Sequence, residues 1–223
     1  MAATRKKSTR QSREVRTQAI LEAARNVFEE QGYENAKVSD IAESVGVVEG
    51  TVFSYFSSKR MLVLKVMEQF YDEITEVIEG GIKAVEGTRN RLHYVIWNHL
   101  TIVSRNRALC GVILRESRGL DKALSKEVHN LNRRYTNIVS DVLNEGIALG
   151  DVREDTSPTL VRNALFGTIE HYLWDLISGV PEFDIDVVAQ QLTDLVFTGI
   201  AVGHGNSSER EVVQLIKKLN KML

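Results

Sequence analysis

Cysteine is almost absent from this chain of 223 residues, and no long apolar run occurs in it. With Cys110 as the single cysteine no intramolecular disulfide can form, which is typical of proteins of the reducing cytoplasm. No apolar run approaches the roughly 20 residues that a membrane span requires. The basic N-terminus leads into an amphipathic segment rather than an apolar core with a cleavage site, so export is not expected. These absences predict a cytoplasmic protein without a membrane partner.

The signatures of the common enzyme classes are missing as well. The sequence has no Walker-type glycine loop, no HExxH, no Cys-x-x-Cys and no nucleophile elbow. His93 and His99 lie on different faces of an expected helix, so they are not expected to share a metal ion. The sequence therefore predicts no catalytic residue, no metal site and no cofactor.

Proline is rare too, since Pro158 and Pro181 are the only two in the chain. A hydrophobic content of 43% is enough for a sizeable core, and no sustained alternation of apolar and polar residues marks a strand. Apolar periodicity instead predicts one helix after another beyond Lys59. The expected helices span residues 59–80, 88–106, 109–118, 120–150, 157–178, 184–202 and, after a glycine-containing break, 208–223.

The segment 38–65 is the most informative part of the chain. Ile41, Ala42 and Val45 recur at helical spacing, and Gly46 follows where the end of a helix needs a residue tolerant of positive φ. This pattern predicts a helix that stops at a tight turn.

A second short helix is expected over residues 49–53, with Val52 facing inward. Small residues at its outward positions would let it lie deep in a major groove. These residues are Gly50, Thr51 and Ser54. Two aromatics and two serines, which are candidate caps, then precede a helix that begins at Lys59. The pattern favours a helix-turn-helix that binds DNA over a helical hairpin with no role in nucleic-acid binding.

This pattern resembles the TetR family of bacterial one-component transcriptional regulators, over about residues 13–66. Upstream, the resemblance rests on Ala19-Ile20-Leu21, Ala23-Ala24, Val27-Phe28, Gly32-Tyr33 and Asp40-Ile41-Ala42. It implies an all-α fold, with an N-terminal three-helix helix-turn-helix domain and a larger C-terminal helical domain for ligand binding and dimerisation. The expected division is a basic disordered arm (1–12), a DNA-binding domain (13–58) and a ligand-binding and dimerisation domain (59–223).

Three positions depart from the usual family pattern. Val48 stands where a Ser or Thr commonly caps the recognition helix, and Phe53 stands where a Tyr hydroxyl commonly reaches a phosphate. Lys37 replaces the hydroxyl cap expected before the second helix, so each of the two helix starts should be weaker by about 1 kcal/mol. A phosphate contact from Lys37 would offset part of that loss. The candidate DNA-contacting residues are Lys37, Val48, Glu49, Gly50, Thr51, Phe53, Ser54, Tyr55 and Lys59.

The net charge of -2 hides an uneven distribution. Residues 1–65 hold 11 Lys and Arg against 8 Asp and Glu, whereas the remainder holds 17 against 22. Six of the basic residues and one acid lie in the first 16 positions. Such a segment is expected to be disordered when free. It could follow the DNA backbone or enter a minor groove, or it could be a solvated leader.

A helix-turn-helix monomer contacts one half-site, so specific binding generally needs a two-fold dimer with half-sites about 34 Å or a multiple apart. The two most apolar late helices, 157–178 and 184–202, are the expected interface, as a four-helix arrangement of the kind that the family resemblance implies. The alternative for each residue is ordinary core within one chain. The interface candidates are Val161, Leu165, Ile169, Leu173, Leu192, Leu195, Val196 and Gly199.

Aromatic and polar residues on the middle helices could line an apolar cavity for a ligand. The runs Leu114-Arg115-Glu116-Ser117 and Leu165-Phe166-Gly167-Thr168-Ile169-Glu170 are similar to segments of the FadR-type, acyl-CoA-responsive branch of the TetR family. This similarity implies an acyl chain in an apolar tunnel, with Arg115 or Arg118 at a phosphate or thioester-side group. Otherwise the two arginines are salt-bridged surface residues. The candidate ligand-binding residues are Tyr94, Trp97, Cys110, Arg115, Arg118, Tyr135, Phe166, Glu170, His171 and Trp174.

Together these patterns predict a dimeric repressor that binds a palindromic double-stranded DNA operator. A small apolar ligand, such as a long-chain acyl-CoA or fatty acid, would release the operator by favouring a conformation with badly spaced DNA-binding heads. Two alternatives remain: an activator or constitutive DNA-binding regulator without a ligand, and a helical interaction protein.

Overall fold

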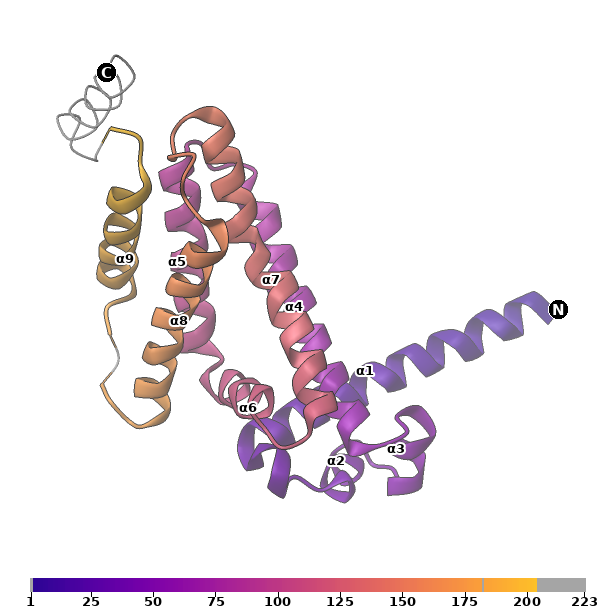
Figure 1. Ribbon diagram of the computed structural model, residues 1–223. Helices are drawn as coiled ribbons and strands as arrows, with labels where there is room; N and C mark the ends of the chain where they lie inside the picture. The colour runs from indigo at the N-terminus through magenta and orange to yellow at the C-terminus, as the bar shows by residue number, and fades with distance from the viewer. Residues whose placement is uncertain (1, 182, 204–223) are drawn as a thin grey trace, which may run out of the picture. The chain divides into compact units, whose positions relative to one another are not determined.

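The computed structural model describes residues 2–181 and 183–203, with side chains from residue 13 onward. Within these ranges the chain forms nine helices, and the only strand-like pairing is an isolated bridge between Val152 and Ala201 (Figure 1). The predicted all-α fold is therefore confirmed. The predicted helix over 208–223 lies outside the described residues. The helices are α1 (Ala2–Asn35), α2 (Val38–Ser44), α3 (Glu49–Tyr55), α4 (Lys59–Ile82), α5 (Thr88–Arg105), α6 (Arg107–Ser117), α7 (Lys122–Leu149), α8 (Pro158–Ile177) and α9 (Ile185–Ile200).

The chain divides into two compact units. The first contains Met1–Val77, Ile102–Tyr135 and Leu173–Val180, and the second contains Ile78–Thr101, Thr136–Tyr172 and the chain from Pro181 on. The predicted boundary between the DNA-binding domain and the ligand-binding domain lies between residues 58 and 59. The first compact unit instead continues to Val77 and includes two later segments of the chain. Each of α4, α5, α7 and α8 contributes residues to both units.

Helix α1 begins at Ala2, although a disordered arm was predicted over residues 1–12. That arm contains two Ala, two Lys and two Arg, and all three residue types favour helix. Near its other end, α1 is interrupted at Gly32, whose φ of 73° belongs to the left-handed region that glycine tolerates.

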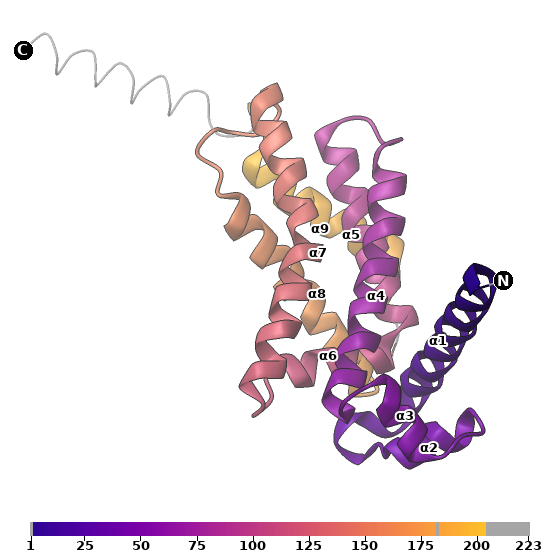
Figure 2. The same cartoon turned by 90° about the vertical axis from the view of Figure 1, so that its right-hand side faces the viewer.

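The first three helices share one small core. Helix α2 packs against α1 and against α3, and all three lie together in both views (Figures 1 and 2). Phe28 of α1 and Ile41 of α2 are fully buried, and Val52 of α3 is 1% exposed. The side that Val52 faces is therefore closed by apolar packing, and the opposite side of α3 is left open. Helix α6 also packs against α1.

In the second unit, α5 and α9 are joined by a row of polar contacts one helical turn apart on α5. Arg89 pairs with Asp194, the His93 ring lies 3.1 Å from the Thr193 hydroxyl, and the Trp97 indole donates to Asp186 over 2.6 Å. Later residues of α5 contact earlier residues of α9, so the two helices are antiparallel. No described helix is long and apolar enough to cross a bilayer.

Candidate DNA-binding surface and ligand-sensing residues

The turn between α2 and α3 has the predicted geometry. Gly46 has a φ of 67°, which an L-residue rarely adopts. The amides of Val45 and Gly46 return to carbonyls of α2, and Val47 donates to Ala42 over 3.0 Å. The two helices are thus held at a fixed angle by the backbone itself.

Both helix starts lack a side-chain cap, as predicted. Lys37 precedes α2 and Val48 precedes α3, each with extended backbone and without a side-chain hydrogen bond to the first turn. The start of α4 is different, because the Ser58 hydroxyl accepts a hydrogen bond from the Met61 amide over 3.1 Å. The predicted serine cap there is confirmed.

The open side of α3 presents several of the predicted contact residues. Val48 is 74% exposed and Phe53 is 42% exposed, and Glu49 and Gly50 are also exposed. Thr51 is half-buried, and Ser54 donates its hydroxyl to the Thr51 carbonyl over 2.6 Å. The structure therefore brings most of the predicted DNA-contacting residues to one surface.

The last turn of α3 and the start of α4 are tied back to α1. The guanidinium of Arg13 lies 5.5 Å above the ring of Tyr55. The Lys59 ammonium donates to the Glu34 carbonyl over 3.0 Å and lies 4.8 Å from the centre of the Tyr33 ring. Carbonyls at the end of a helix attract cations, so Lys59 stabilises the joint between α1 and α4 instead of extending along α3.

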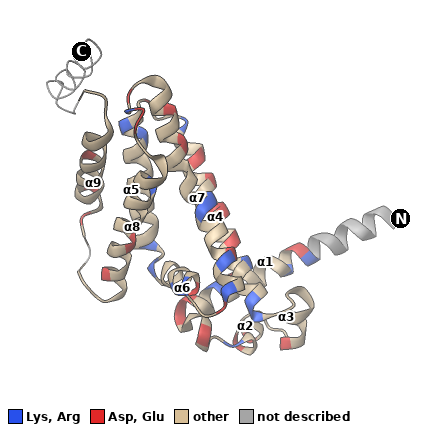
Figure 3. Cartoon of the chain, viewed as in Figure 1, with Lys and Arg blue, Asp and Glu red and all other residues tan. Residues whose placement is uncertain are grey.

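The first turns of α4 carry Lys and Arg, and its later turns carry Asp and Glu (Figure 3). This order opposes the helix dipole, which favours acids at the start of a helix. Contacts from other elements compensate: besides the Lys59 contact, Arg60 lies 3.6 Å from Asp121 in the connection between α6 and α7. The start of α4 is thus held electrostatically from two directions.

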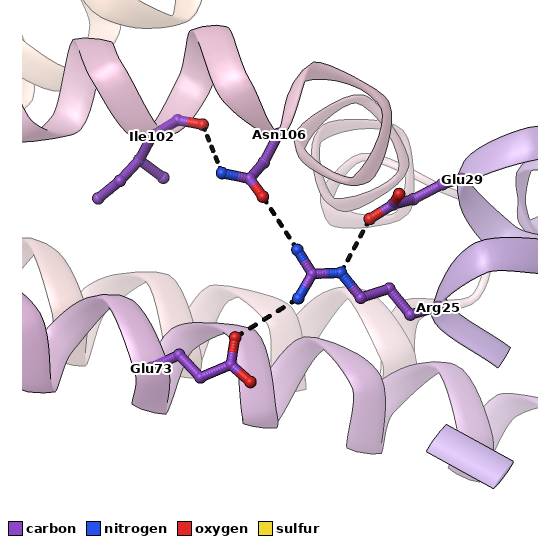
Figure 4. Close-up of polar contacts among 5 residues, drawn as sticks. All are labelled: Arg25, Glu29, Glu73, Ile102 and Asn106. Carbon is purple, nitrogen blue, oxygen red and sulfur yellow. Dashed lines mark hydrogen bonds and ion pairs between the residues drawn. The ribbon is translucent and has the colours of Figure 1, made fainter. Parts of the chain in front are cut away.

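Arg25 of α1 is the centre of a polar network that the sequence analysis did not identify (Figure 4). Its guanidinium donates to Glu29 over 2.9 Å, to Glu73 of α4 over 3.4 Å and to the Asn106 side-chain oxygen over 2.9 Å. Asn106 stands between α5 and α6 and donates to the Ile102 carbonyl. One side chain therefore links α1, α4 and the α5–α6 junction. Only the spacing of Arg25 and Glu29, which fits one helical turn, was visible in the sequence.

Arg115 lies on a cleft of about 560 Å³ formed by the end of α1, the end of α6 and the connection to α7. Its guanidinium lies close to Gly32, where a Cβ would be 3.5 Å from Nη2. The cleft is lined by five carboxylates: Glu29, Glu30, Glu34, Glu116 and Asp121. Burial, and secondly the negative charge of Glu34, raises the pKa of Glu116. Such surroundings repel an anion, so the cleft disfavours the predicted role of Arg115 at a ligand phosphate. Arg118 is exposed in the same unit.

Two other predicted ligand residues, Cys110 and Tyr135, belong to a buried cluster of the first unit. The ring of Tyr135 packs 5.9 Å from that of Tyr71, and all three side chains are at most 8% exposed. Burial raises the pKa of the Cys110 thiol to about 12 and raises that of Tyr135. Both groups are therefore neutral at physiological pH and suit an apolar environment.

In the second unit, the rings of His99 and Phe166 form a T-shaped pair, with 4.7 Å between centroids. Burial lowers the pKa of His99 from 6.5 to about 3, so its imidazole is neutral at physiological pH. Tyr94 packs against Gly81, where a Cβ would collide with the Tyr94 hydroxyl. Trp97 is engaged by Asp186 of α9. The predicted residues Tyr94, Trp97 and Phe166 thus take part in packing within this unit.

The remaining predicted residues lie on α8. Glu170 is half-buried and His171 is exposed, and Trp174, in the first unit, is 40% exposed. Among the described residues, no group of three or more His, Cys, Asp or Glu side chains is placed to hold a metal ion.

The predicted dimer interface on α8 was assigned to the wrong face of the helix. Its four residues are at most 8% exposed, because they form the core within the chain: Val161, Leu165, Ile169 and Leu173. Leu192 of α9 is buried in the same way. The exposed face of α8 instead carries Leu160, Ala164, Gly167, His171 and Trp174. On α9, Leu195 is 75% exposed and Gly199 is exposed, whereas Val196 is half-buried.

An all-helical chain with a tight helix-turn-helix near its N-terminus, followed by a larger helical region, is typical of DNA-binding transcriptional regulators. Residues 20–66 match the family described as bacterial regulatory proteins, tetR family, and residues 85–200 match the tetracyclin repressor-like C-terminal domain. The chain belongs to the TetR family of transcriptional regulators, as the sequence resemblance implied.

Similar proteins include regulators of fatty acid metabolism. The fatty acid metabolism regulator protein of Bacillus subtilis is 28% identical over 181 residues, which cover 81% of this chain and 93% of the relative. The crystal structure of the transcriptional regulator FadR from the same organism, in complex with stearoyl-CoA, matches with a TM-score of 0.75 and 27% identity over 82% of this chain and 98% of that chain. The transcriptional repressor KstR2 of Mycolicibacterium smegmatis is 24% identical over 196 residues, covering 86% of this chain and 93% of the relative. These relatives are regulators and not enzymes.

Proposed function

We propose that this protein is a dimeric repressor that binds a palindromic operator through α3 and leaves it when a long-chain acyl-CoA binds. The observation that carries the proposal is the match to FadR in complex with stearoyl-CoA, which extends over 82% of this chain.

The DNA-binding part is supported by the geometry of the first three helices. The apolar side of α3 is closed by the core around Val52, and its other side is open. A recognition helix in a major groove contacts bases mainly with its N-terminal residues, which here are Val48 to Thr51. Lys37, exposed at the start of α2, is the candidate for a phosphate contact.

The exposed faces of α8 and α9 support dimerisation. Small residues on α8, Ala164 and Gly167, would let another helix approach closely, and Leu160 lies one turn away. On α9, Val187 is 49% exposed and Leu195 is 75% exposed, and Val202, just after the end of the helix, is 53% exposed. We infer that two copies bury these faces against each other, because so many large apolar side chains are rarely left exposed on a monomer.

The ligand part is supported by the apolar character of the middle helices. In the first unit, the thiol of Cys110 and the phenol of Tyr135 are neutral at physiological pH. In the second unit, the imidazole of His99 is neutral as well, and the side chain of Phe166 is a hydrocarbon. An acyl tail gains roughly 0.8 kcal/mol for each methylene that it buries, which is enough for micromolar binding even after ordering costs. The carboxylates of its cleft disfavour a phosphate at Arg115, so of the two predicted arginines Arg118 is the better candidate for the polar end of the ligand.

Calorimetric titration of the DNA-free protein with a series of acyl-CoAs tests the ligand proposal. We expect affinity to rise with chain length until the tunnel is full, whereas coenzyme A without an acyl chain binds weakly. If every chain length binds as weakly as coenzyme A, the protein is a regulator without this ligand, and the alternative of constitutive DNA binding gains support.

A further inference from the structure

The recognition unit lacks the residue types that usually read bases in a major groove. Residues 38–58 include α2, the turn and α3, and they contain no Lys, Arg, Asn or Gln. Arg and Lys read guanine, and Asn and Gln read adenine, through hydrogen bonds to the purine edge. Side chains of this segment therefore cannot make the usual bidentate contacts with purines.

The hydroxyls of Thr51 and Ser54 on α3 are also poorly available for base contacts. Ser54 donates to the Thr51 carbonyl over 2.6 Å, so its proton is used within the helix. Thr51 itself is half-buried. The exposed carboxylate of Glu49 can only accept a hydrogen bond when it is ionised, and the donors in the major groove are the amino groups of cytosine and adenine.

Apolar side chains are instead the largest exposed groups on this surface. Val48, directly before the first turn of α3, is 74% exposed, and Phe53 is 42% exposed. Val48 lies one turn before the buried Val52, and Phe53 lies about 100° around the helix axis from it, so these exposed side chains flank the buried side of α3. In a major groove, the only apolar group on a base edge is the C5-methyl of thymine.

We propose that Val48 and Phe53 recognise thymine C5-methyl groups in the major groove, and that this contact contributes most of the sequence preference of α3. The inference rests on the proposed placement of α3 in that groove. Affinity that does not depend on sequence then comes from contacts between DNA phosphates and exposed cations outside the segment. These cations are Lys37, Arg13 and Arg16.

The test uses DNA in which only the methyl group changes. A site is first selected from random duplex DNA with the full-length protein. Each thymine of the site is then replaced by deoxyuridine, which pairs like thymine but lacks the methyl. At a sensitive position, cytosine is compared with 5-methylcytosine, a second pair that differs by the same group.

We expect deoxyuridine to weaken binding by about fourfold for each methyl that is covered, the effect of about one buried methyl-sized group. We also expect 5-methylcytosine to bind more tightly than cytosine by a similar factor. Equal affinity of the thymine and deoxyuridine sites would overturn the inference and leave DNA binding intact. Failure to select any site would instead count against the proposed function itself.

Protein variants assign each methyl to a side chain. In Val48→Ala and Phe53→Ala, the penalty for deoxyuridine should disappear at the base that the removed side chain covered. Val77→Ala is the matched control, because Val77 on α4 is 62% exposed and lies outside the recognition unit. If both variants keep the full penalty of the wild type, the assignment is wrong. Because the DNA series needs no variant, the inference stays testable even if one of these proteins folds poorly.

Discussion

The guanidinium of Arg25 lies 2.9 Å from the side-chain oxygen of Asn106, although 81 residues separate the two in the sequence. The same guanidinium reaches Glu29 and Glu73, and it lies 5.5 Å above the ring of Phe70. Because a guanidinium has five N–H donors in a fixed plane, one arginine can hold three helical elements in register.

Replacing Arg25 by lysine should therefore cost stability even though the charge is kept. A single ammonium cannot reproduce the planar arrangement of donors, so we expect Arg25→Lys to lower the free energy of unfolding by about 1 kcal/mol, a value reduced for partial solvent exposure. Urea denaturation followed by circular dichroism measures the change. The control is Arg134→Lys, since Arg134 pairs with Asp72 of α4 at a more exposed position and should change stability by less than about 0.5 kcal/mol. Equal losses in the two variants would argue against a special role of the network.

Substitutions on α8 and α9 should separate dimerisation from folding. Leu195→Glu places a charge on the exposed face of α9, so we expect it to yield a helical monomer in sedimentation. Leu165→Glu buries a charge in the core, where the side chain is 1% exposed, and should unfold or severely destabilise the protein by several kcal/mol.

Leu120→Glu is the control for this pair, because Leu120 is fully exposed in the α6–α7 connection. It should remain a folded dimer. A Leu195→Glu protein that also stays dimeric at micromolar concentration would exclude α9 from the interface.

Adding a hydroxyl at position 48 should strengthen the start of α3. Val48→Thr has nearly the same shape and can accept a hydrogen bond from the first turn, so we expect a gain of about 1 kcal/mol in the free energy of unfolding of the first unit. Hydrogen exchange of the α3 amides is the appropriate measurement. Val48→Ala cannot cap the helix and should give no gain, and equal protection in both variants would show that capping is not the cause.

Histidine 99 should make stability depend on pH. Its pKa is lowered by burial to about 3 in the folded protein, against 6.5 when unfolded, so between these values the unfolded state binds the extra proton. Stability should consequently fall as pH decreases from 6.5 toward 3, by up to about 1.4 kcal/mol per pH unit. The pKa of Glu116 is raised in the folded protein, so this group makes stability rise as pH decreases. The contribution of His99 is therefore measured as the difference in pH dependence between wild type and a His99 variant.

His99→Gln should have a flatter pH dependence than wild type when unfolding is measured between pH 7 and 5. His129→Gln, at an exposed position of α7, should keep the wild-type slope. A wild-type slope in His99→Gln would contradict the predicted neutral imidazole.

Local features of this protein followed from its sequence, and long-range ones did not. Gly46, the cap at Ser58 and the missing cap at Val48 depend on a few neighbouring residues, so their types alone predicted the geometry. The face of α8 could not be assigned in this way, because that helix has apolar residues on both its buried and its exposed side.

The same limit applies to the contacts that the predicted site residues make within the chain. Trp97 and Arg115 are predicted ligand residues, and the structure shows that the Trp97 indole donates to Asp186 and that Arg115 lies on a carboxylate-lined cleft near Gly32. Such partners are set by how helices pack, and nothing in the spacing of the residues reveals them. Lys59, a predicted DNA contact, is bonded to the end of α1 in the same way, and its position in the sequence did not indicate this bond.

Release of the operator by acyl-CoA distinguishes a ligand-responsive repressor from a regulator without this ligand. A fluorescently labelled selected site, bound to the full-length protein, is titrated with acyl-CoAs of increasing chain length while anisotropy is followed. We predict that the concentration for half-release falls with each added methylene, by up to about fourfold, until the pocket is full, and that coenzyme A alone releases nothing. Operator binding that no acyl-CoA disturbs, at any chain length, would contradict the account.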